Sequence, residues 1–307
     1  MRQDINTMLS GKTFNLDDVM FNEITISSAN LAQLQSICKE YGFSSFLTES
    51  KNQVKLGKNY KELGLYTIGM SLSPYELGNH DFTVCFNATT SCKANCVIQN
   101  AGNPAYLPNK QKAMLKRKAL LADNPSLFLA MFMRYIELKS LYCIKNNLAL
   151  SIRFNISSDI NYENIQIVYH DIETSFSDMA YELIRKTDAD VMPYDYTKNF
   201  DRLQNKNYHL VYSVSDSDIS KSISAIKNGL SLAIVFDVDR NKPLPDCYQI
   251  GDYTLPVIDG DEHDYLPAYK DKLVIHGLRF KFKASDNKAK RRQAIDKAML
   301  SGFVYPA

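Results

Sequence analysis

Short strand-like apolar runs alternate with longer helical stretches over most of the chain. One of these runs, Leu230–Asp237, is almost continuously apolar, which is typical of a parallel strand buried on both faces. Alternation of strands with helices indicates the α/β class with a mainly parallel sheet. The other strand-like runs are Leu65–Leu72, Leu148–Asn155, Val191–Tyr194, Tyr208–Val214, Leu255–Ile258 and Leu273–Phe280, with Tyr162–Tyr169 either a strand or the start of a helix.

Helical spacing and capping residues mark the stretches between these runs. Asn124 followed by Pro125 is a helix-start signal, and it precedes the long apolar stretch Pro125–Lys145. Residues 50–62 are polar and basic, and we expect them to form an exposed connection. The other predicted helices are Leu31–Tyr41, Lys110–Ala122, Phe176–Lys186, Ile219–Asn228 and a basic stretch within residues 283–307.

Six or seven strand candidates follow residue 63. This number favours a full or partial parallel β/α barrel over residues 63–307, preceded by an N-terminal extension over residues 1–62. A doubly wound open sheet is the alternative. The chain contains neither the GxGxxG nor the GxxxxGK[ST] phosphate-binding loop, so no nucleotide fingerprint supports that alternative.

Composition narrows the class of protein. The 307 residues are 45% hydrophobic with a formal net charge of +2, which indicates an ordinary globular chain without a strong overall field. The start has no apolar signal region, and the longest apolar stretch, Leu127–Met133, is far shorter than a membrane span. We therefore expect a protein of the cytoplasm with no membrane partner; its oligomeric state stays open.

Three of the six cysteines lie within twelve residues of a long polar loop, residues 75–109. Cys85, Cys92 and Cys96 have the spacing Cys-x6-Cys-x3-Cys, and two metal interpretations compete. One is a 4Fe–4S cluster on three thiolates, which leaves one iron open to a cofactor or substrate. The other is zinc with a fourth ligand such as His80. A third interpretation is three thiols without a metal.

The remaining cysteines, Cys38, Cys143 and Cys247, lie in apolar or isolated surroundings. We expect them to be ordinary structural thiols, because six cysteines in 307 residues are too few for a disulfide scaffold.

The cysteine loop follows the first strand of the α/β region. In a β/α barrel this places it at the mouth formed by the carboxyl ends of the strands. The layout is similar to that of radical-SAM enzymes and implies S-adenosylmethionine as a candidate ligand of the open iron. The usual spacing of that superfamily, Cys-x3-Cys-x2-Cys, is not present.

Polar clusters follow several predicted strands, and in a barrel they converge on one pocket for a small polar or phosphorylated molecule or a nucleotide. Acids there bind hydroxyls, cations or amines, lysines bind phosphate or carboxylate, and His263 or His276 moves protons. The alternative is that these residues are turn and cap residues. We assign catalytic roles to Asp159, Asp195, Lys198, Asp261 and Lys281, and cofactor contacts to Asn155, Tyr196, Ser213 and Asp259.

Two basic stretches offer a different partner, nucleic acid, through contacts to phosphates. Solvated helix faces are the alternative, because a run of charges is usually a solvent-exposed helix face. The stretches consist of Lys110, Lys112, Lys116, Arg117 and Lys118, and of Arg279, Lys281, Lys283, Lys288, Lys290, Arg291 and Arg292.

The order of several motifs resembles the gene product 88 family of phages and plasmids. The segment LGLYTIGMSLSP, the three cysteines and QNAG are followed by RFNISSDI, YDYTK, YHLVYSVS, VIDGDEHD, GLRFK and SGFV, over roughly residues 63–305. The resemblance implies an α/β domain with a cysteine cluster, in the host cytoplasm if phage-encoded. It also implies that the three cysteines and the acids, lysines and tyrosine at the strand ends are the positions to test.

Three functions follow from these patterns. The first is a metalloenzyme with an iron–sulfur cluster on the cysteine loop. The second is a zinc-stabilised nucleic-acid-binding accessory protein of a phage or mobile element. The third is a structural or host-interaction protein in which the cysteine loop only stabilises the fold.

Overall fold

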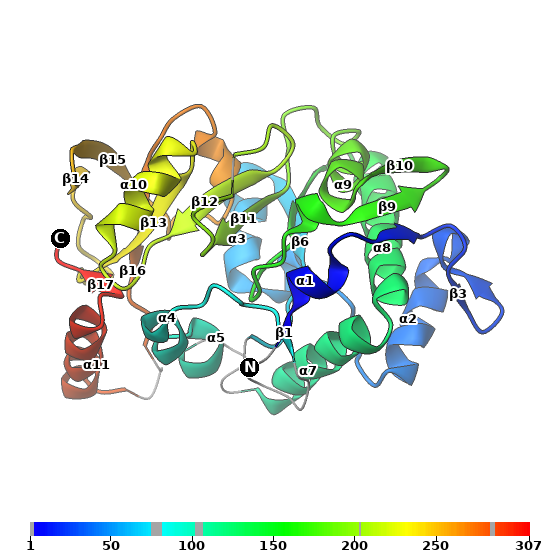
Figure 1. Cartoon of the computed structure of the whole chain (residues 1–307), viewed down its shortest axis with the longest axis horizontal. Coiled ribbons are helices and arrows are strands. Elements are labelled where there is room, and N and C mark those ends of the chain that lie inside the picture. The colour runs from blue at the N-terminus through cyan, green and yellow to red at the C-terminus, as the bar shows by residue number, and fades with distance from the viewer. Residues whose placement is uncertain (1–2, 75–81, 102–106, 203, 283–285) are drawn as a thin grey trace. The chain divides into compact units, whose positions relative to one another are not determined.

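The computed structural model describes residues 3–74, 82–101, 107–202, 204–282 and 286–307 (Figure 1). The chain divides into two compact units, each assembled from several segments. Unit 1 comprises Met1–Phe86, Asn109–Tyr194 and Lys206–Tyr208. Unit 2 comprises Asn87–Pro108, Asp195–Asn205 and His209–Ala307.

A parallel sheet forms the centre of unit 1. Strand β6 (Leu65–Gly69) is buried along its whole length and pairs in parallel with β8 (Ala149–Arg153), with Ile68 opposite Ile152. Strand β8 pairs in parallel with Tyr194, the first residue of β11 (Tyr194–Thr197). The other edge is β5 (Thr48–Glu49), which runs antiparallel to β6.

An aromatic cluster centred on Phe132 packs between helices and sheet in unit 1. The ring of Phe132 lies 5.3 Å from that of Phe176 and 6.0 Å from that of Phe154, between ring centroids. Phe132 belongs to α8, whose N-cap is Asn124. Most of the apolar side chains in the first half of this helix are buried. The helices of unit 1 are α1 (Ile5–Leu9), α2 (Leu31–Glu40), α3 (Val54–Leu63), α7 (Pro108–Asp123), α8 (Pro125–Lys145) and α9 (Phe176–Ile184).

Short strands extend unit 1. Strands β9 (Gln166–Tyr169) and β10 (Ile172–Ser175) form a hairpin beside α8 and α9 (Figure 1). Its two turn residues, His170 and Asp171, both have positive φ, as a type I′ turn requires. The other pairs are β1 (Gln3–Asp4) with β7 (Phe82–Thr83), β2 (Thr13–Asn15) with β9, and β3 (Met20–Phe21) with β4 (Ile24–Thr25).

Unit 2 is built on a second set of parallel strands. Strand β13 (Ser231–Phe236) pairs in parallel with β12, β16 and β17, and it is almost fully buried, which confirms the prediction from its apolar run. The strand order is β11, β12 (His209–Ser213), β13, β16 (Ile275–Arg279), β15 (Tyr253–Asp259) and the antiparallel edge β14 (Cys247–Ile250), with β17 (Val304–Tyr305) beside β13.

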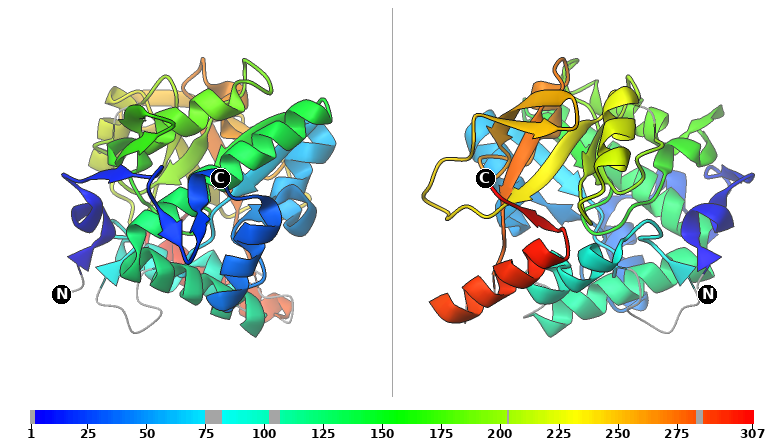
Figure 2. Two further views of the ribbon diagram at one scale, coloured as in Figure 1. Left: turned by 90° about the vertical axis from the view of Figure 1, so that its right-hand side faces the viewer. Right: turned by 60° about the vertical axis from the view of Figure 1, so that its left-hand side comes forward.

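Helices of unit 2 lie on and beside this sheet. Helix α10 (Ile219–Lys227) lies over β13, and α11 (Lys288–Leu300) lies next to β17 (Figure 2). The part of the cysteine loop around Cys92 and Cys96 forms two short helices, α4 (Thr90–Ala94) and α5 (Val97–Asn100). The described residues also form four 3-10 turns: Ile26–Ser28, Ser50–Asn52, Tyr162–Asn164 and Leu266–Tyr269.

The α/β class with a large, mostly parallel sheet is confirmed, but a closed barrel is not shown by the described strands. Two local predictions were wrong. Residues 50–62 are mainly helix α3, which Gln53 caps and whose Leu56 is fully buried. The strand expected at Val191–Tyr194 begins only at Tyr194, because Pro193 has no N–H for the ladder. Within the described residues, no helix is both long enough and apolar enough to cross a membrane.

Replacing Phe132 by alanine removes the ring at the centre of the aromatic cluster of unit 1. We expect Phe132→Ala to lower the free energy of unfolding by about 3–5 kcal/mol, measured by urea denaturation. The control is Leu141→Ala on the same helix, whose side chain is 55% exposed, with an expected change within about 0.5 kcal/mol. Equal effects of the two variants would contradict this packing.

Candidate functional site

In unit 1 the residues around Cys85 attach to the carboxyl ends of β6 and β8. The Cys85 thiol donates to the carbonyl of Ser157 at 3.5 Å, and the Ser157 hydroxyl donates to the carbonyl of Leu72 at 2.6 Å. The backbone N–H of Asp159 donates to the carbonyl of Val84 at 2.7 Å. Cys85 therefore lies where the parallel strands of this unit end, as its position in the sequence predicted.

Asn155 organises the loop after β8. Its Oδ1 accepts from the Ser158 hydroxyl at 2.7 Å and from the Ile160 N–H at 2.9 Å, and its side chain is buried. These bonds make it a turn residue, which was the alternative to a cofactor contact.

Two acids lie close together beside this loop. Asp159 is 5% exposed, and Asp4 is half-buried at the N-cap of α1. Burial, with a smaller contribution from the nearby Asp159 carboxylate, raises the pKa of Asp4 above its ordinary value. Sequence reasoning assigned a role to Asp159 but missed Asp4, because only the fold brings residues 1–10 to this loop.

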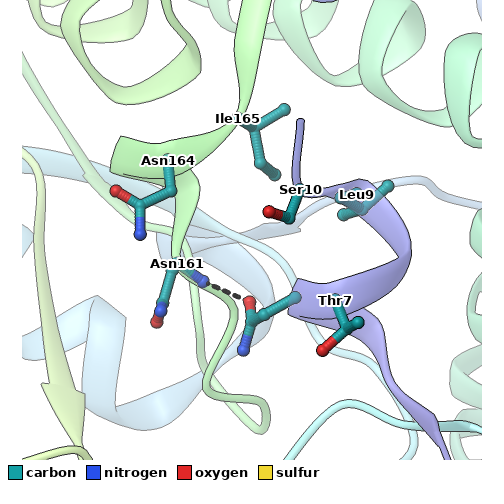
Figure 3. A pocket seen from close by; sticks show the side chains of 7 residues that line it. Thr7, Leu9, Ser10, Asn161, Asn164 and Ile165 are labelled. Atoms are coloured by element: carbon teal, nitrogen blue, oxygen red, sulfur yellow. Dashed lines mark hydrogen bonds between the residues drawn. The ribbon is translucent and has the colours of Figure 1, made fainter. Parts of the chain in front are cut away.

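A cavity of about 250 Å³ opens between α1 and residues 161–165 (Figure 3). Asn6 connects it to Asp159, because its Nδ2 donates to the Asp159 carbonyl at 3.4 Å while its Oδ1 accepts from the Asn161 N–H at 2.8 Å. The Oδ1 of Asn161 is buried and has no hydrogen-bond partner among the described residues. Amides and hydroxyls dominate the lining, which consists of Asn6, Thr7, Leu9, Ser10, Asn161, Asn164 and Ile165.

In unit 2 the helix that contains Cys92 is fixed to the carboxyl end of β12. Thr89, the N-cap of α4, places its hydroxyl 3.0 Å from the hydroxyl of Ser215. The Ser91 N–H donates to the Asp216 carboxylate at 3.2 Å. The second part of the cysteine loop therefore also lies at strand carboxyl ends.

The loop that holds α4 has an unusual backbone. Asp216 and Ser217 have φ values of 61° and 53°, a region that residues other than glycine rarely adopt. Gly302 stabilises it by accepting from the Ser217 N–H at 3.2 Å, and a Cβ on Gly302 would lie 2.5 Å from that nitrogen. Backbone of this kind persists where the surrounding structure holds it, often at functional sites.

The two loop thiols of unit 2, Cys92 and Cys96, are partly exposed, and Cys92 influences the ionisation of Cys96. Burial raises the pKa of Cys96, and a Cys92 thiolate nearby raises it further, against hydrogen bonds from the N–H groups of Gln99 and Ile98. No group of three His, Cys, Asp or Glu side chains suited to a metal ion occurs among the described residues, and His80 lies outside them. Cys38 and Cys143 are buried as expected, and Cys247 is exposed on β14.

The Lys198 side chain binds backbone carbonyls at the end of β12. Its ammonium donates to the carbonyl of Ser213 at 2.6 Å and to that of Val214 at 3.3 Å, and it lies over the ring of Phe303. Asp195 is fully buried and Tyr196 is half-buried on the same strand, β11. The structure thus brings Lys198 and Ser213 together, through a contact that holds the strand ends.

The acidic run after β15 forms an ion-pair network with the end of β16. Arg279 contacts both carboxylate oxygens of Asp259 at 2.9 Å, and its N–H donates to Asp261 at 3.0 Å. Lys281 also contacts Asp261. The sequence analysis gave Asp259, Asp261 and Lys281 roles in a pocket and placed Arg279 only in a basic stretch, although GLRFK faces DGD across neighbouring strands.

His263 and His276, the two histidines predicted to move protons, both lie against the ring of Tyr269. The ring of His263 stacks on Tyr269 with centroids 6.1 Å apart, and the buried His276 meets the same ring edge-on at 5.9 Å. Burial raises the pKa of Tyr269, with smaller contributions from Glu262 and Asp259.

Comparison with family models gives one match, to gene product 88, over residues 46–297. The chain belongs to the gene product 88 family. The matched region begins before the expected start at residue 63 and includes β5 and α3, which pack on β6. No curated protein and no solved structure matched this member of the family. The similarity of layout to radical-SAM enzymes is not confirmed.

The pairing of Cys92 and Cys96 predicts a measurable change in thiol reactivity. In metal-free protein at pH 8, Cys92→Ser should make alkylation of Cys96 by iodoacetamide a few-fold faster, because removal of the Cys92 thiolate favours ionisation of Cys96. Peptide mass spectrometry over time gives the rate, with exposed Cys247 as the internal reference. An unchanged rate at Cys96 would contradict the coupling.

Proposed function

We propose that this gene product 88 protein is a metalloenzyme that works at the carboxyl ends of its parallel strands. Thiolates of Cys85, Cys92 and Cys96 hold a 4Fe–4S cluster, and polar groups beside them bind a small polar substrate. The observation that supports this most is the attachment of the cysteine loop to strand carboxyl ends, by Cys85 in unit 1 and by Thr89 and Ser91 in unit 2.

The residue types fit such a cluster, whereas the described positions of the three thiols do not form a metal-binding group. Three thiols are what a cluster with one open iron requires, and thiolates select iron–sulfur clusters or zinc over hard cations. A bound cluster supplies an electron-transfer or Lewis-acid centre at its open iron, with S-adenosylmethionine one candidate ligand. Each half of the loop has its own attachment, so the thiols are held by contacts that do not depend on the metal.

The substrate side of the proposal rests on the cavity of unit 1. Its lining contains amide and hydroxyl groups and no charged side chain, so it suits a ligand rich in hydroxyls or amides better than a highly charged one. Asn6, which lines the cavity, donates from Nδ2 to the Asp159 backbone carbonyl at 3.4 Å and to the Asp4 carboxylate at 3.3 Å. We assign proton transfer or hydroxyl binding to Asp159, with Asp4 as its neighbouring acid.

Metal and sulfide analysis of protein purified without oxygen tests the cluster. We expect about four iron and four sulfide per chain with a broad absorption near 400 nm, and loss of most of both in Cys85→Ala, Cys92→Ala or Cys96→Ala. Cys247→Ser is the matched control and should keep its full content, because Cys247 lies on the exposed edge strand β14. A content of one zinc per chain would indicate a structural zinc site instead of the cluster. A protein without any metal would overturn the proposal.

A zinc-stabilised nucleic-acid-binding protein is the second candidate, favoured by helix α11. Only Ala298 of this helix is buried, so the helix has no apolar face. Lys288, Lys290 and Arg291 are exposed on it. The first basic stretch supports this candidate less, because Arg117 and Lys118 are buried. Arg117 donates to the carbonyls of Ser45 and Phe46, and burial lowers its pKa to about 10.

Salt-dependent binding separates this candidate from a purely enzymatic role. If α11 contacts phosphates, the triple variant Lys288→Gln, Lys290→Gln, Arg291→Gln should weaken DNA or RNA binding and reduce the slope of log affinity against log salt by about 1 per contact removed. Fluorescence anisotropy measures both. The control replaces three exposed lysines elsewhere, Lys39, Lys186 and Lys227. Absence of binding at low salt would exclude this candidate.

A further inference from the structure

A second cavity lies in unit 2, at the amino ends of the parallel strands. It has a volume of about 210 Å³, and its lining comes from the starts of β12 and β13 and from the segment before β16. The polar strand ends described above are at the opposite ends of the same strands. The lining residues are Gln204, His209, Gly229, Ser231, Lys270, Asp271, Lys272 and Leu273.

Hydrogen bonds around Gln204 fix the tautomer of His209. The Leu210 N–H donates to Oε1 of Gln204 at 2.9 Å, so the other side-chain atom of that amide is the NH₂ group. This NH₂ group lies 3.4 Å from Nδ1 of His209 and also donates to the Leu210 carbonyl at 3.2 Å. Nδ1 is therefore the acceptor, and the ring proton of the neutral histidine is on Nε2.

The Nε2–H group of His209 is a buried donor with nothing to donate to. The side chain is 3% exposed, and Nε2 has no hydrogen-bond partner among the described residues. A buried N–H without an acceptor is costly, so such a group indicates a missing ligand or water. Burial, with a smaller contribution from Lys270, lowers the pKa of His209 to about 4, so the ring is neutral near pH 7.

The charged groups around the cavity favour an anion. Lys270 and Lys272 are exposed at its rim, Asp271 lies between them, and the lining has one positive charge in excess. Ser231 is occupied by the backbone, because its hydroxyl accepts from the Val274 N–H at 3.1 Å and donates to the Lys272 carbonyl at 3.3 Å. The groups that remain to bind an anion are thus Nε2–H of His209 and the ammonium groups of Lys270 and Lys272.

We propose that this cavity binds a small oxyanion, a phosphate or carboxylate group, that accepts from Nε2–H of His209 and pairs with Lys270. The volume is below that of pockets for drug-sized ligands, which suits an inorganic ion or a small metabolite. The Asp271 carboxylate on the same rim disfavours highly charged anions such as nucleoside triphosphates. This site does not depend on the metal or on the substrate proposed above.

Nuclear magnetic resonance of the histidine rings in the unaltered full-length protein tests this site. Addition of inorganic phosphate should shift the His209 Nε2–H signal and raise the pKa of that ring, because a bound anion favours the protonated imidazole. Sodium chloride at matched ionic strength should do neither. His170, exposed in unit 1, is the internal control and should not respond to phosphate.

Titration of two lysine variants with phosphate tests the assigned partner. Lys270→Met should weaken phosphate binding by about tenfold or more, since it removes a charge-assisted contact, whereas Lys227→Met on α10 should bind as the unaltered chain does. Both lysines are exposed, so folding is not at risk. A His209 ring that ignores phosphate, or equal binding by the two variants, would overturn the proposal and leave a cavity filled by water.

Discussion

Parallel pairing of buried strands is the constraint on which the rest of the structure depends. Strands such as β6 and β13 use their backbone groups in the ladder and bury their side chains on both faces, so polar chemistry is confined to the strand ends. In each unit the carboxyl ends of parallel strands share one edge. The cysteine loop, the acids and the ion-pair network all occur at these edges, which is where α/β proteins place their ligands.

Local signals were sufficient for the elements that depend on them. Helix α8 was predicted to the residue, with Asn124 and Pro125 marking its start. The apolar run Leu230–Asp237 predicted β13 to within one residue at each end. Helix α3 was missed because it buries little, with Leu56 and Asn59 at 0% exposure, and Asn59 depends on distant partners. The Asn59 amide donates to the hydroxyls of Thr67 and Tyr194, each at 3.0 Å, and neither contact can be read from residues 50–62 alone.

The roles of the candidate site residues depend on partners that the sequence does not show. Most of the candidate acids and lysines lie at or after strand ends, whereas Asp195 lies within β11. Lys198 binds two carbonyls and Asn155 organises its own turn. Arg279, which the sequence analysis assigned only to a nucleic-acid-binding stretch, binds Asp259 and Asp261. The buried donor of His209 had no sequence signal, because it depends on the orientation of the Gln204 amide.

The most direct test of the proposed metalloenzyme keeps all three thiols but removes the contacts that attach α4 to the end of β12. The measurement is the metal and sulfide content of a Thr89→Val, Asp216→Gly variant purified without oxygen, beside the unaltered protein; glycine removes the acceptor and tolerates the positive φ of position 216. We predict a full cluster in the unaltered protein and a large loss in the variant, because α4 loses its contacts to the end of β12. A variant with full content, or an unaltered protein without iron and sulfide, would contradict the account.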